Sequence, residues 1–388
     1  MTRVCWRCDA RTDDHRRVRC DCGEPLWLET DPDAAPDSFP TCVESMWDVL
    51  PLLGVDSPSP GNGLPAAAGG TPLVRTESLD TDGVAVHVKP EGLNPTGSFK
   101  DRGTAFGIAA ALERGEDRVG TVSHGNMAES VAAGAAAAGM DCTVLVPADI
   151  ADERLAAIAR HGPRLVRVDG DYGRLYHEAL EVGREAGVRF LNSDAPWRVA
   201  GQATTALEVL VQLDDAPDAL VLPVSSGGHA SGTWQAVRAL TGAGLLDSPP
   251  KLCFVQAAAC APIAEAYARG DDEVTPVEGG ETIAYSIANA DPPSGSRALA
   301  AARATDGAVV AVDDAAIERA GERFAGAGLA VEPASATTLA ALEPLRDARV
   351  LDRGDTAVLV ATGRGFGDPD AAIETEHVEL AAVGSLFA

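Results

Sequence analysis

Short β-branched runs alternate with Ala-rich stretches along the chain from about residue 70. The β-branched runs predict strands, and the Ala-rich stretches that follow them predict helices. Three such pairs are Val119–Val122 with Met127–Ala138, Cys142–Val146 with Asp152–His161, and Ala219–Val224 with Ala230–Leu240. Repeated strand–helix units predict an α/β fold in which a mostly parallel sheet carries helices on both faces. Ligands of such folds bind at the carboxyl ends of the strands.

The first 70 residues depart from this pattern. Residues 31–70 are rich in Pro, Asp, Gly and Ala, which is typical of a linker, and they contain one short helical stretch near Val43–Leu53. Residues 1–30 are charged and carry two close pairs of cysteines. We therefore expect a separate segment at 1–30, a linker at 31–70 and a core at 71–388.

The two cysteine pairs, Cys5-x-x-Cys8 and Cys20-x-Cys22, predict a small zinc ribbon. Cysteine pairs in a reducing compartment favour a metal over disulfides, and a segment this short needs the metal for stability. Four thiolate ligands are typical of a closed structural site. Cys-x-Cys is tighter than the usual spacing, so an unoccupied knuckle is the alternative. His15 is another candidate ligand, with a solvated side chain as the alternative for it.

Charge and hydropathy exclude several classes of function. The 388 residues carry a net charge of −27, with a pI of about 4.5, so nucleic acid would be repelled. No apolar run approaches the roughly 20 residues of a membrane helix, so no membrane partner is expected. The start of the chain lacks the apolar stretch of a secretory signal, which predicts a cytoplasmic protein.

Basic residues are nearly all arginine, and the acidic residues are spread along the whole chain. An acidic, lysine-poor surface is typical of adaptation to high salt, where screening suppresses self-repulsion. The three lysines are Lys89, Lys100 and Lys251. Because arginine cannot form a Schiff base, a retained lysine is a candidate for chemistry that needs an amine. A leftover surface lysine is the alternative.

Four polar, Gly-rich loops follow strands or open helices in the core. They are Asn94–Gly103, Ser123–Asn126, Ser225–Gly232 and Ala361–Pro369. In the first loop, Lys100 lies near a predicted helix start, where the helix dipole disfavours a protonated amine. An ordinary turn and cap is the alternative for this loop. In the second loop, Asn126 can cap the following helix or bind a ring hydroxyl.

The third loop follows the strand Ala219–Val224 and opens a helix. Backbone N–H groups of a Gly/Ser loop at a helix N-terminus can hold phosphate, although many such loops bind nothing. The fourth loop follows a strand at Ala357–Val360 and offers a hydroxyl at Thr362. Each of these two signals is weak alone.

Taken in order, the four loops resemble those of the fold-type-II pyridoxal phosphate (PLP) enzymes, and most closely the threonine synthase family. The stretch Asn94-Pro95-Thr96-Gly97-Ser98-Phe99-Lys100-Asp101-Arg102-Gly103 matches that family's lysine motif throughout, and the N-terminal cysteine segment is also similar. The resemblance implies a tryptophan synthase β-like fold of two mostly parallel sheets with helices on both faces. It also implies a smaller subdomain at about 104–203 inserted in the larger one.

The resemblance implies a role for individual residues of these loops. Lys100 would carry the cofactor as a Schiff base and Asn126 would bind its 3′-oxygen. The 5′-phosphate would be held by Ser226, Gly227, Gly228, His229 and Ala230. Thr362 would bind the pyridine nitrogen, and a neutral hydroxyl there tunes the ring as an electron sink.

One further stretch, Asn192–Arg198, resembles the segment in which threonine synthases hold the substrate phosphate. Asn192, Ser193 and Arg198 would bind that phosphate, with help from Ser123. An arginine fork suits a phosphate dianion because it bonds two oxygens at once. The alternative is that Arg198 pairs with a surface carboxylate, which is easy in so acidic a protein.

Two departures from the family's pattern leave the substrate open. The Ser225–His229 loop is closer to the Gly/Ser loops of amino-acid dehydratases, and His124 stands where a small hydroxyl residue is typical. Both histidines, His124 and His229, are candidates for titration near neutrality, with a packing role as the alternative.

The resemblance implies a threonine synthase, which converts O-phosphohomoserine and water to threonine and phosphate. Its amino-acid substrate would be the small-molecule partner, and a homodimer is an open possibility because relatives are often dimers. The alternatives are a serine/threonine dehydratase, a related β-replacement enzyme, and an inactive PLP-binding regulator.

Overall fold

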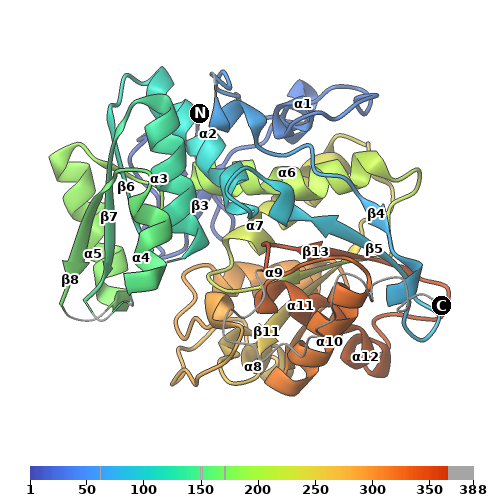
Figure 1. Ribbon diagram of the computed structural model, residues 1–388. Coiled ribbons are helices and arrows are strands. Elements are labelled where there is room, and N and C mark those ends of the chain that lie inside the picture. The colour runs from blue at the N-terminus through green and yellow to red at the C-terminus, as the bar shows by residue number, and fades with distance from the viewer. Residues whose placement is uncertain (62, 124, 149, 151, 170–171, 366–388) are drawn as a thin grey trace, which may run out of the picture.

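The computed structural model describes residues 1–61, 63–123, 125–148, 150, 152–169 and 172–365, which form three β-sheets surrounded by helices (Figure 1). The helices are α1 (Met46–Val49), α2 (Lys100–Glu113), α3 (Asn126–Ala138), α4 (Asp152–Ala159), α5 (Tyr172–Ala186), α6 (Pro196–Gln212), α7 (Gly228–Gly242), α8 (Pro262–Arg269), α9 (Gly295–Ala304), α10 (Asp314–Gly326), α11 (Pro333–Ala340) and α12 (Leu342–Asp347). None of them, within these described residues, has both the length and the apolar character needed to cross a bilayer.

The largest sheet has six strands in the order β12-β11-β10-β13-β5-β4. All neighbouring strands run parallel except β4, which pairs antiparallel with β5 at one edge. The strands are β4 (Val74–Arg75), β5 (Ala85–Pro90), β10 (Ala219–Pro223), β11 (Lys251–Ala257), β12 (Ala308–Val312) and β13 (Thr356–Ala361).

Alternate residues of these strands face two different hydrophobic cores. Along β10, Leu220 and Leu222 join the core that contains α6, α7 and α9, whereas Ala219 and Val221 join the core that contains α10 and α11. Because successive side chains of a strand point to opposite faces, both faces of the sheet are covered by helices.

A second sheet has four parallel strands in the order β8-β7-β6-β9. They are β6 (Arg118–Val122), β7 (Asp141–Pro147), β8 (Arg164–Val168) and β9 (Arg189–Phe190). Helix α3 supplies Met127 and Val131 to the core on one face, together with Ile108 of α2, and Ala128 and Ala132 to the core that reaches α4. The green part of Figure 1 shows this sheet beside the larger one.

The first 30 residues form a small antiparallel sheet of β1 (Arg3–Cys5), β2 (Arg11–Thr12) and β3 (Leu26–Leu28) in the order β2-β1-β3. This segment packs on the main core through aromatic rings. Trp6 and Trp27 lie with their ring centroids 5.9 Å and 5.6 Å from that of Trp234 in α7.

The helical stretch predicted near Val43–Leu53 is split in two. Helix α1 covers only Met46–Val49, and the 3-10 helix Leu50–Leu53 follows directly. Pro51 accounts for the change, because a proline has no N–H to donate to an α-helical hydrogen bond. The side chains of Met46, Val49, Leu50, Leu52 and Leu53 are buried in the main core, and Trp47 packs against it partly buried.

The α/β fold with two mostly parallel sheets and helices on both faces is therefore confirmed. The strand–helix pairs predicted from the pattern all appear, with ends shifted by a few residues. The division into a segment at 1–30, a linker at 31–70 and a core with an inserted unit stays a prediction, although the strands of the four-stranded sheet all lie between Arg118 and Phe190.

Candidate functional site

Lys100 is the first residue of α2, directly after the predicted turn. The carboxylate of Asp101 fixes this turn, because it accepts hydrogen bonds from the backbone N–H of Thr96 (2.6 Å), the hydroxyl of Thr96 (2.7 Å) and the hydroxyl of Ser130 (2.6 Å). The Ser130 bond joins the turn to α3. The buried carboxylate of Asp101 therefore holds the lysine loop in its turn and also connects it to α3.

The Lys100 amine lies in an environment that disfavours its charge. Burial and the nearby guanidinium of Arg198 lower the pKa of Lys100 to about 8, while the Glu332 carboxylate opposes this shift. The Nζ atom lies 4.4 Å from the centre of the Phe99 ring. A depressed pKa was expected here from the helix start, and burial is its largest cause in the structure.

The fourth loop lies against the lysine loop. The N–H of Phe99 donates to the carbonyl of Thr362 (2.9 Å), and the N–H of Arg364 donates to the carbonyl of Gly97 (2.9 Å). Two loops that are more than 260 residues apart in the sequence are therefore joined by backbone hydrogen bonds.

A buried carboxylate links Thr362 to Asn126. Glu332, which precedes α11, accepts from the Asn126 side-chain amide (3.0 Å) and from the Thr362 hydroxyl (3.3 Å). The Thr362 hydroxyl also lies 3.1 Å from that of Ser335. Burial raises the pKa of Glu332. Asn126 is the first residue of α3, and Gly125 is the cap, so the alternative role of Asn126 as a helix cap is wrong.

Glu332 and Ser335 are not among the site residues predicted from the sequence. The available signal was local: an acid directly before Pro333 at a helix start, in the segment that precedes the fourth loop. Nothing in the spacing indicated that this acid reaches α3 in the other sheet unit.

The third loop has the geometry of a phosphate cradle. Gly227 has φ +87°, which only glycine adopts without strain, and α7 begins at Gly228. A Cβ at Gly228 would collide with the carbonyl oxygen of Ser193, so the backbone approaches the Asn192–Arg198 stretch closely. Ala230 is buried in the first turn of α7, whereas Ser226 before the turn is half-buried. The first N–H groups of a helix have no intrahelical partner, so this glycine-containing helix start fits a phosphate group such as that of PLP.

His229 packs instead of titrating. Its ring stacks on Phe99 with centroids 4.1 Å apart, and its Nε2 atom lies 3.1 Å from the Thr205 hydroxyl. Burial and the charge of Lys100 hold the pKa of His229 well below its usual value, so the ring is neutral at physiological pH. The expectation of titration near neutrality is therefore wrong for His229. His124 lies outside the described residues.

Arg198 is completely buried and points to the lysine helix. Its guanidinium donates to the hydroxyl of Thr104 (2.8 Å) and to the carbonyl of Lys100 (3.3 Å), and its Nε atom has no partner among the described residues. Burial lowers the pKa of Arg198 to about 10. The alternative that Arg198 pairs with a surface carboxylate is wrong, because the side chain does not reach the surface.

The neighbouring polar residues of this stretch are also buried. Asn192 accepts from the N–H of Val122 (3.0 Å), and its Nδ2 atom has no partner in the described part of the chain. The Ser193 hydroxyl lies 3.2 Å from the Tyr176 hydroxyl. Ser123, at the end of β6, is half-buried and accepts from the N–H of Gly125 (3.3 Å). The stretch Asn192–Arg198 therefore holds two buried donors without partners in the described part of the chain, Asn192 Nδ2 and Arg198 Nε, and such donors suit an anionic ligand.

A buried ionic network holds α2, the helix that begins at Lys100. The Arg102 guanidinium donates to the carboxylates of Glu91 and Glu208 over distances of 2.6 to 2.8 Å, and all three side chains are 0% exposed. Because Glu208 belongs to α6 and Glu91 follows β5, the network connects the helix that carries Lys100 to both.

Lys89 belongs to the same network. It shows that a lysine can be retained in this chain for a structural reason. Its ammonium donates to the carbonyl of Thr71 (2.6 Å), to Glu208 (2.7 Å) and to Gln212 (2.9 Å). Three acceptors around one nitrogen suit an ammonium and not a planar guanidinium. Lys89 is therefore retained for its geometry, whereas Lys100 is the lysine at the loop cluster.

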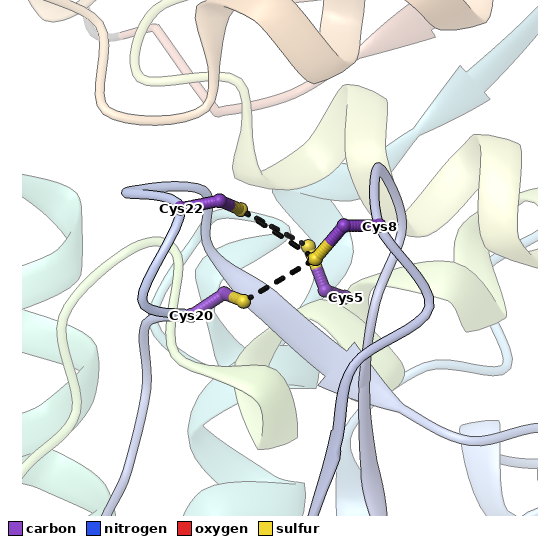
Figure 2. Close-up of side chains that lie close together, drawn as sticks. All are labelled: Cys5, Cys8, Cys20 and Cys22. Atoms are coloured by element: carbon purple, nitrogen blue, oxygen red, sulfur yellow. Dashed lines mark hydrogen bonds between the residues drawn. The ribbon is translucent and has the colours of Figure 1, made fainter.

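The four predicted metal ligands lie together. Figure 2 shows the sulfurs of Cys5, Cys8, Cys20 and Cys22 turned toward one another, all within 4.8 Å. The measured Sγ–Sγ distances are 3.6, 3.6 and 3.8 Å. A tetrahedral zinc with bonds of ~2.3 Å to sulfur has edges of about 3.8 Å, so the cluster fits zinc. His15 lies elsewhere, with its Nε2 atom 3.9 Å from Glu116.

Comparison with known proteins agrees with this site. Residues 64–363 match the family described as pyridoxal-phosphate dependent enzyme. The chain is 34% identical to the threonine synthase of Methanocaldococcus jannaschii, over 97% of this chain and 95% of that one. It is 38% identical to the threonine synthase of Mycobacterium leprae, over 79% and 84% of the two chains.

Solved structures share the fold. A threonine deaminase from T.th. matches with a TM-score of 0.63 and 28% identity, covering 77% of this chain and 94% of that one. The processed threonine deaminase isoform 2 of Solanum lycopersicum matches with a TM-score of 0.66 and 20% identity, covering 88% and 96%. The fold and the cluster of four loops in this chain are those of the PLP-dependent enzymes of fold type II. Within that class, the chain belongs to the threonine synthase family.

Proposed function

We propose that this enzyme converts O-phosphohomoserine and water to L-threonine and phosphate, with PLP as its cofactor. The relatives named above support this reaction, since threonine synthases match over most of the chain. The observation that carries the proposal is the buried guanidinium of Arg198. It lies beside Lys100, and among the described residues no carboxylate lies within ion-pair distance of it, although the Asp101 carboxylate acts on it from farther away. A substrate with a phosphate group brings a second anion on its side chain, in addition to the α-carboxylate that all amino acids carry, and free serine and threonine lack that second anion.

The residues proposed to hold the cofactor come from all four loops. Lys100 would bind it covalently and the Ser226–Ala230 loop would hold its phosphate. Asn126 would donate to the 3′-oxygen, and Thr362 would interact with the ring nitrogen. PLP, when bound, withdraws electrons from the α-carbon of the amino acid. Glu332 would orient both the amide of Asn126 and the hydroxyl of Thr362, because it accepts from each.

Lys100 is proposed to move protons at the substrate. A pKa of about 8 leaves a useful fraction of its amine neutral near physiological pH, so the amine can accept the proton from Cα and return it later. Arg198, Asn192, Ser193 and Ser123 would hold the substrate phosphate while it leaves. Zinc at the four cysteines would stabilise the N-terminal sheet and take no part in the chemistry.

The proposal is tested by incubating the PLP-loaded protein at high salt with O-phosphohomoserine, and separately with threonine and with serine. Equal release of phosphate and threonine, abolished in Lys100→Ala, supports it. In Arg198→Gln, kcat/KM for O-phosphohomoserine should fall by about 100-fold or more, because a buried charge partner is lost. Arg198→Lys, which keeps the charge, should recover part of that loss, and retained visible absorbance of the cofactor verifies that the variants are folded.

A serine/threonine dehydratase is the second candidate. The Gly/Ser character of the third loop favours it, and a threonine deaminase is among the structural neighbours. Formation of 2-oxo acid from threonine or serine, with O-phosphohomoserine untouched, would move the assignment there. A β-replacement enzyme would consume none of these three substrates in the absence of an added nucleophile. Cofactor absorbance without turnover would point to a regulator.

We infer that the enzyme works in the cytoplasm at high salt. The acidic composition supports the high-salt setting, and the eight free cysteines, all within the described residues, support a reducing compartment. A homodimer stays a proposal that a sedimentation measurement would test.

A further inference from the structure

One arginine of the four-cysteine segment reaches into the catalytic unit. Arg19 precedes Cys20, and its Nη2 atom donates to the Asp194 carboxylate (2.8 Å) and to the carbonyl of Pro293 (3.1 Å). Its Nη1 atom donates back to the carbonyl of Gly23 (2.7 Å) in its own segment. The Asp194 side chain is 1% exposed and the Arg19 side chain is 25% exposed, so the ion pair is largely buried on the Asp194 side.

Asp194 lies in the stretch proposed to hold the substrate phosphate. It directly follows Ser193, and the Tyr176 hydroxyl donates to it while lying 3.2 Å from the Ser193 hydroxyl. Asp194 therefore fixes Tyr176, and Tyr176 in turn restrains Ser193. A continuous series of contacts therefore connects Arg19, through Asp194 and Tyr176, to Ser193, which is proposed to bind the substrate phosphate.

The charge of Asp194 makes its partner important. A buried carboxylate one residue from a phosphate-binding serine repels a phosphate dianion, because the low dielectric of the interior screens little. The Arg19 guanidinium offsets that charge. Removing it takes away the ion-pair partner of this buried anion, next to the place where the substrate's phosphate is proposed to bind, and leaves Asp194 with the Tyr176 hydroxyl and the more distant charge of Arg297.

A second contact connects the segment to the cofactor loop. Arg297 of α9 donates to the carbonyl of Pro25 (3.2 Å) and to the Ser231 hydroxyl (2.7 Å). That hydroxyl donates to the carbonyl of Gly227 (2.6 Å), which lies in the proposed phosphate cradle. The four-cysteine segment is thus connected to both proposed anion-binding regions, directly at Asp194 and through Arg297 and Ser231 at Gly227.

We propose that Arg19 is a positioning residue, and that metal bound at the four cysteines sets the affinity for the phosphorylated substrate by holding Arg19 on Asp194. Cys20 follows Arg19 in the chain, so the metal fixes the backbone from which the guanidinium extends. The inference rests on the proposed function, since it assumes that the Ser193 region binds substrate phosphate.

The test compares Arg19→Ala with Arg11→Ala. Arg11 lies in the same segment and pairs with Glu29 at the surface, with 64% of its side chain exposed, so it controls for loss of a positive charge. In Arg19→Ala, KM for O-phosphohomoserine and Kd for inorganic phosphate should both rise by roughly 10- to 100-fold, with kcat within about twofold. Cofactor absorbance should be unchanged. Arg11→Ala should match the wild type.

The metal arm uses Cys22→Ser, because Cys22 is exposed and its replacement removes one ligand without opening the core. Zinc content should fall and phosphate Kd should rise as in Arg19→Ala. The double variant Arg19→Ala/Cys22→Ser should bind phosphate no more weakly than Arg19→Ala alone, since both changes act through one contact. Additive losses would overturn the coupling.

The inference and the proposed function fail in different ways. If the wild type neither binds phosphate nor turns over O-phosphohomoserine, both fall. If it does both and Arg19→Ala behaves as Arg11→Ala does, only the inference falls. A loss of cofactor absorbance or of helical circular dichroism in Arg19→Ala would assign Arg19 a structural role and also overturn it.

Discussion

Among single residues, Lys100 and Glu332 form a pair whose charges oppose each other. The amine is pushed toward neutrality by burial and by Arg198, and the carboxylate partly restores its charge. Protonated amine cannot attack an aldehyde, so the rate of cofactor capture depends on this balance.

We predict that capture of PLP by the cofactor-free protein accelerates as the pH rises through about 8, where Lys100 loses its proton. In Glu332→Gln the curve should move to lower pH, because removing a nearby negative charge lowers the pKa of the amine further. Stopped-flow measurement of the visible absorbance gives both curves. Glu185→Gln, an exposed acid on α5, is the control, and an upward move in Glu332→Gln would contradict the electrostatic argument.

Among the secondary-structure elements, the ionic network around Arg102 determines where α2 lies. Lys89 on β5, Arg102 on α2 and Glu208 on α6 share one buried cluster. The lysine helix is therefore fixed to a strand of the large sheet and to its neighbouring helix by charged hydrogen bonds as well as by packing.

Glu208→Gln should lower the free energy of unfolding by about 3–5 kcal/mol, because it leaves two buried cations short of their partner. Urea unfolding followed by circular dichroism measures this, and Glu185→Gln should change it little. Arg102 and Lys89 lower the pKa of Glu208 to about 2, below its unfolded value near 4.5. The stabilisation from Glu208 is therefore complete above pH ~4.5 and is lost as pH falls toward about 2. A Glu208→Gln variant with an unchanged acid transition would show that other carboxylates govern it.

The hydrophobic pattern was sufficient to predict the elements and the sheet type. Strands such as Ala219–Pro223 are short and apolar, and each is followed by a helix. This alternation of strand and helix is what made their positions predictable. Pro51 is the local signal for the split of the helical stretch near Val43–Leu53, which the pattern alone predicts as one helix.

The lysine loop, the glycine loop and the Asn192–Arg198 stretch could be identified as candidates because turn residues and helix starts leave local signals. Glu332, Tyr176 and Asp194 could not, because their importance comes from contacts across 18 to more than 200 residues of chain. Local patterns do not encode such contacts. His229 was misjudged for the same reason: its neutrality comes from burial against Phe99.

The whole molecule carries far more negative than positive charge, with 58 acidic and 31 basic residues. Repulsion between these charges opposes the compact state at low ionic strength. The Debye length falls from ~10 Å at 0.1 M salt to ~3 Å at 1 M, so salt removes most of this repulsion.

We predict that the melting temperature rises steadily as KCl is increased from 0.1 M to above 1 M near pH 7. Near pH 4.5, close to the pI, the net charge approaches zero and the same salt series should have a much smaller effect. Scanning calorimetry at the two pH values separates repulsion from general effects of salt on apolar burial. Equal gains at both pH values would contradict the charge argument.

The three lysines also make the protein unusually easy to label at one position. Lys89 is buried with three acceptors around its nitrogen, and Lys251 donates to the carbonyl of Val350 (2.7 Å) and is half-buried. Borohydride reduction would leave a stable pyridoxyl group on a single amine, and peptide mass mapping would find it in one fragment. In an acidic enzyme with only three lysines, the amine proposed to hold the cofactor can therefore be tagged with almost no background.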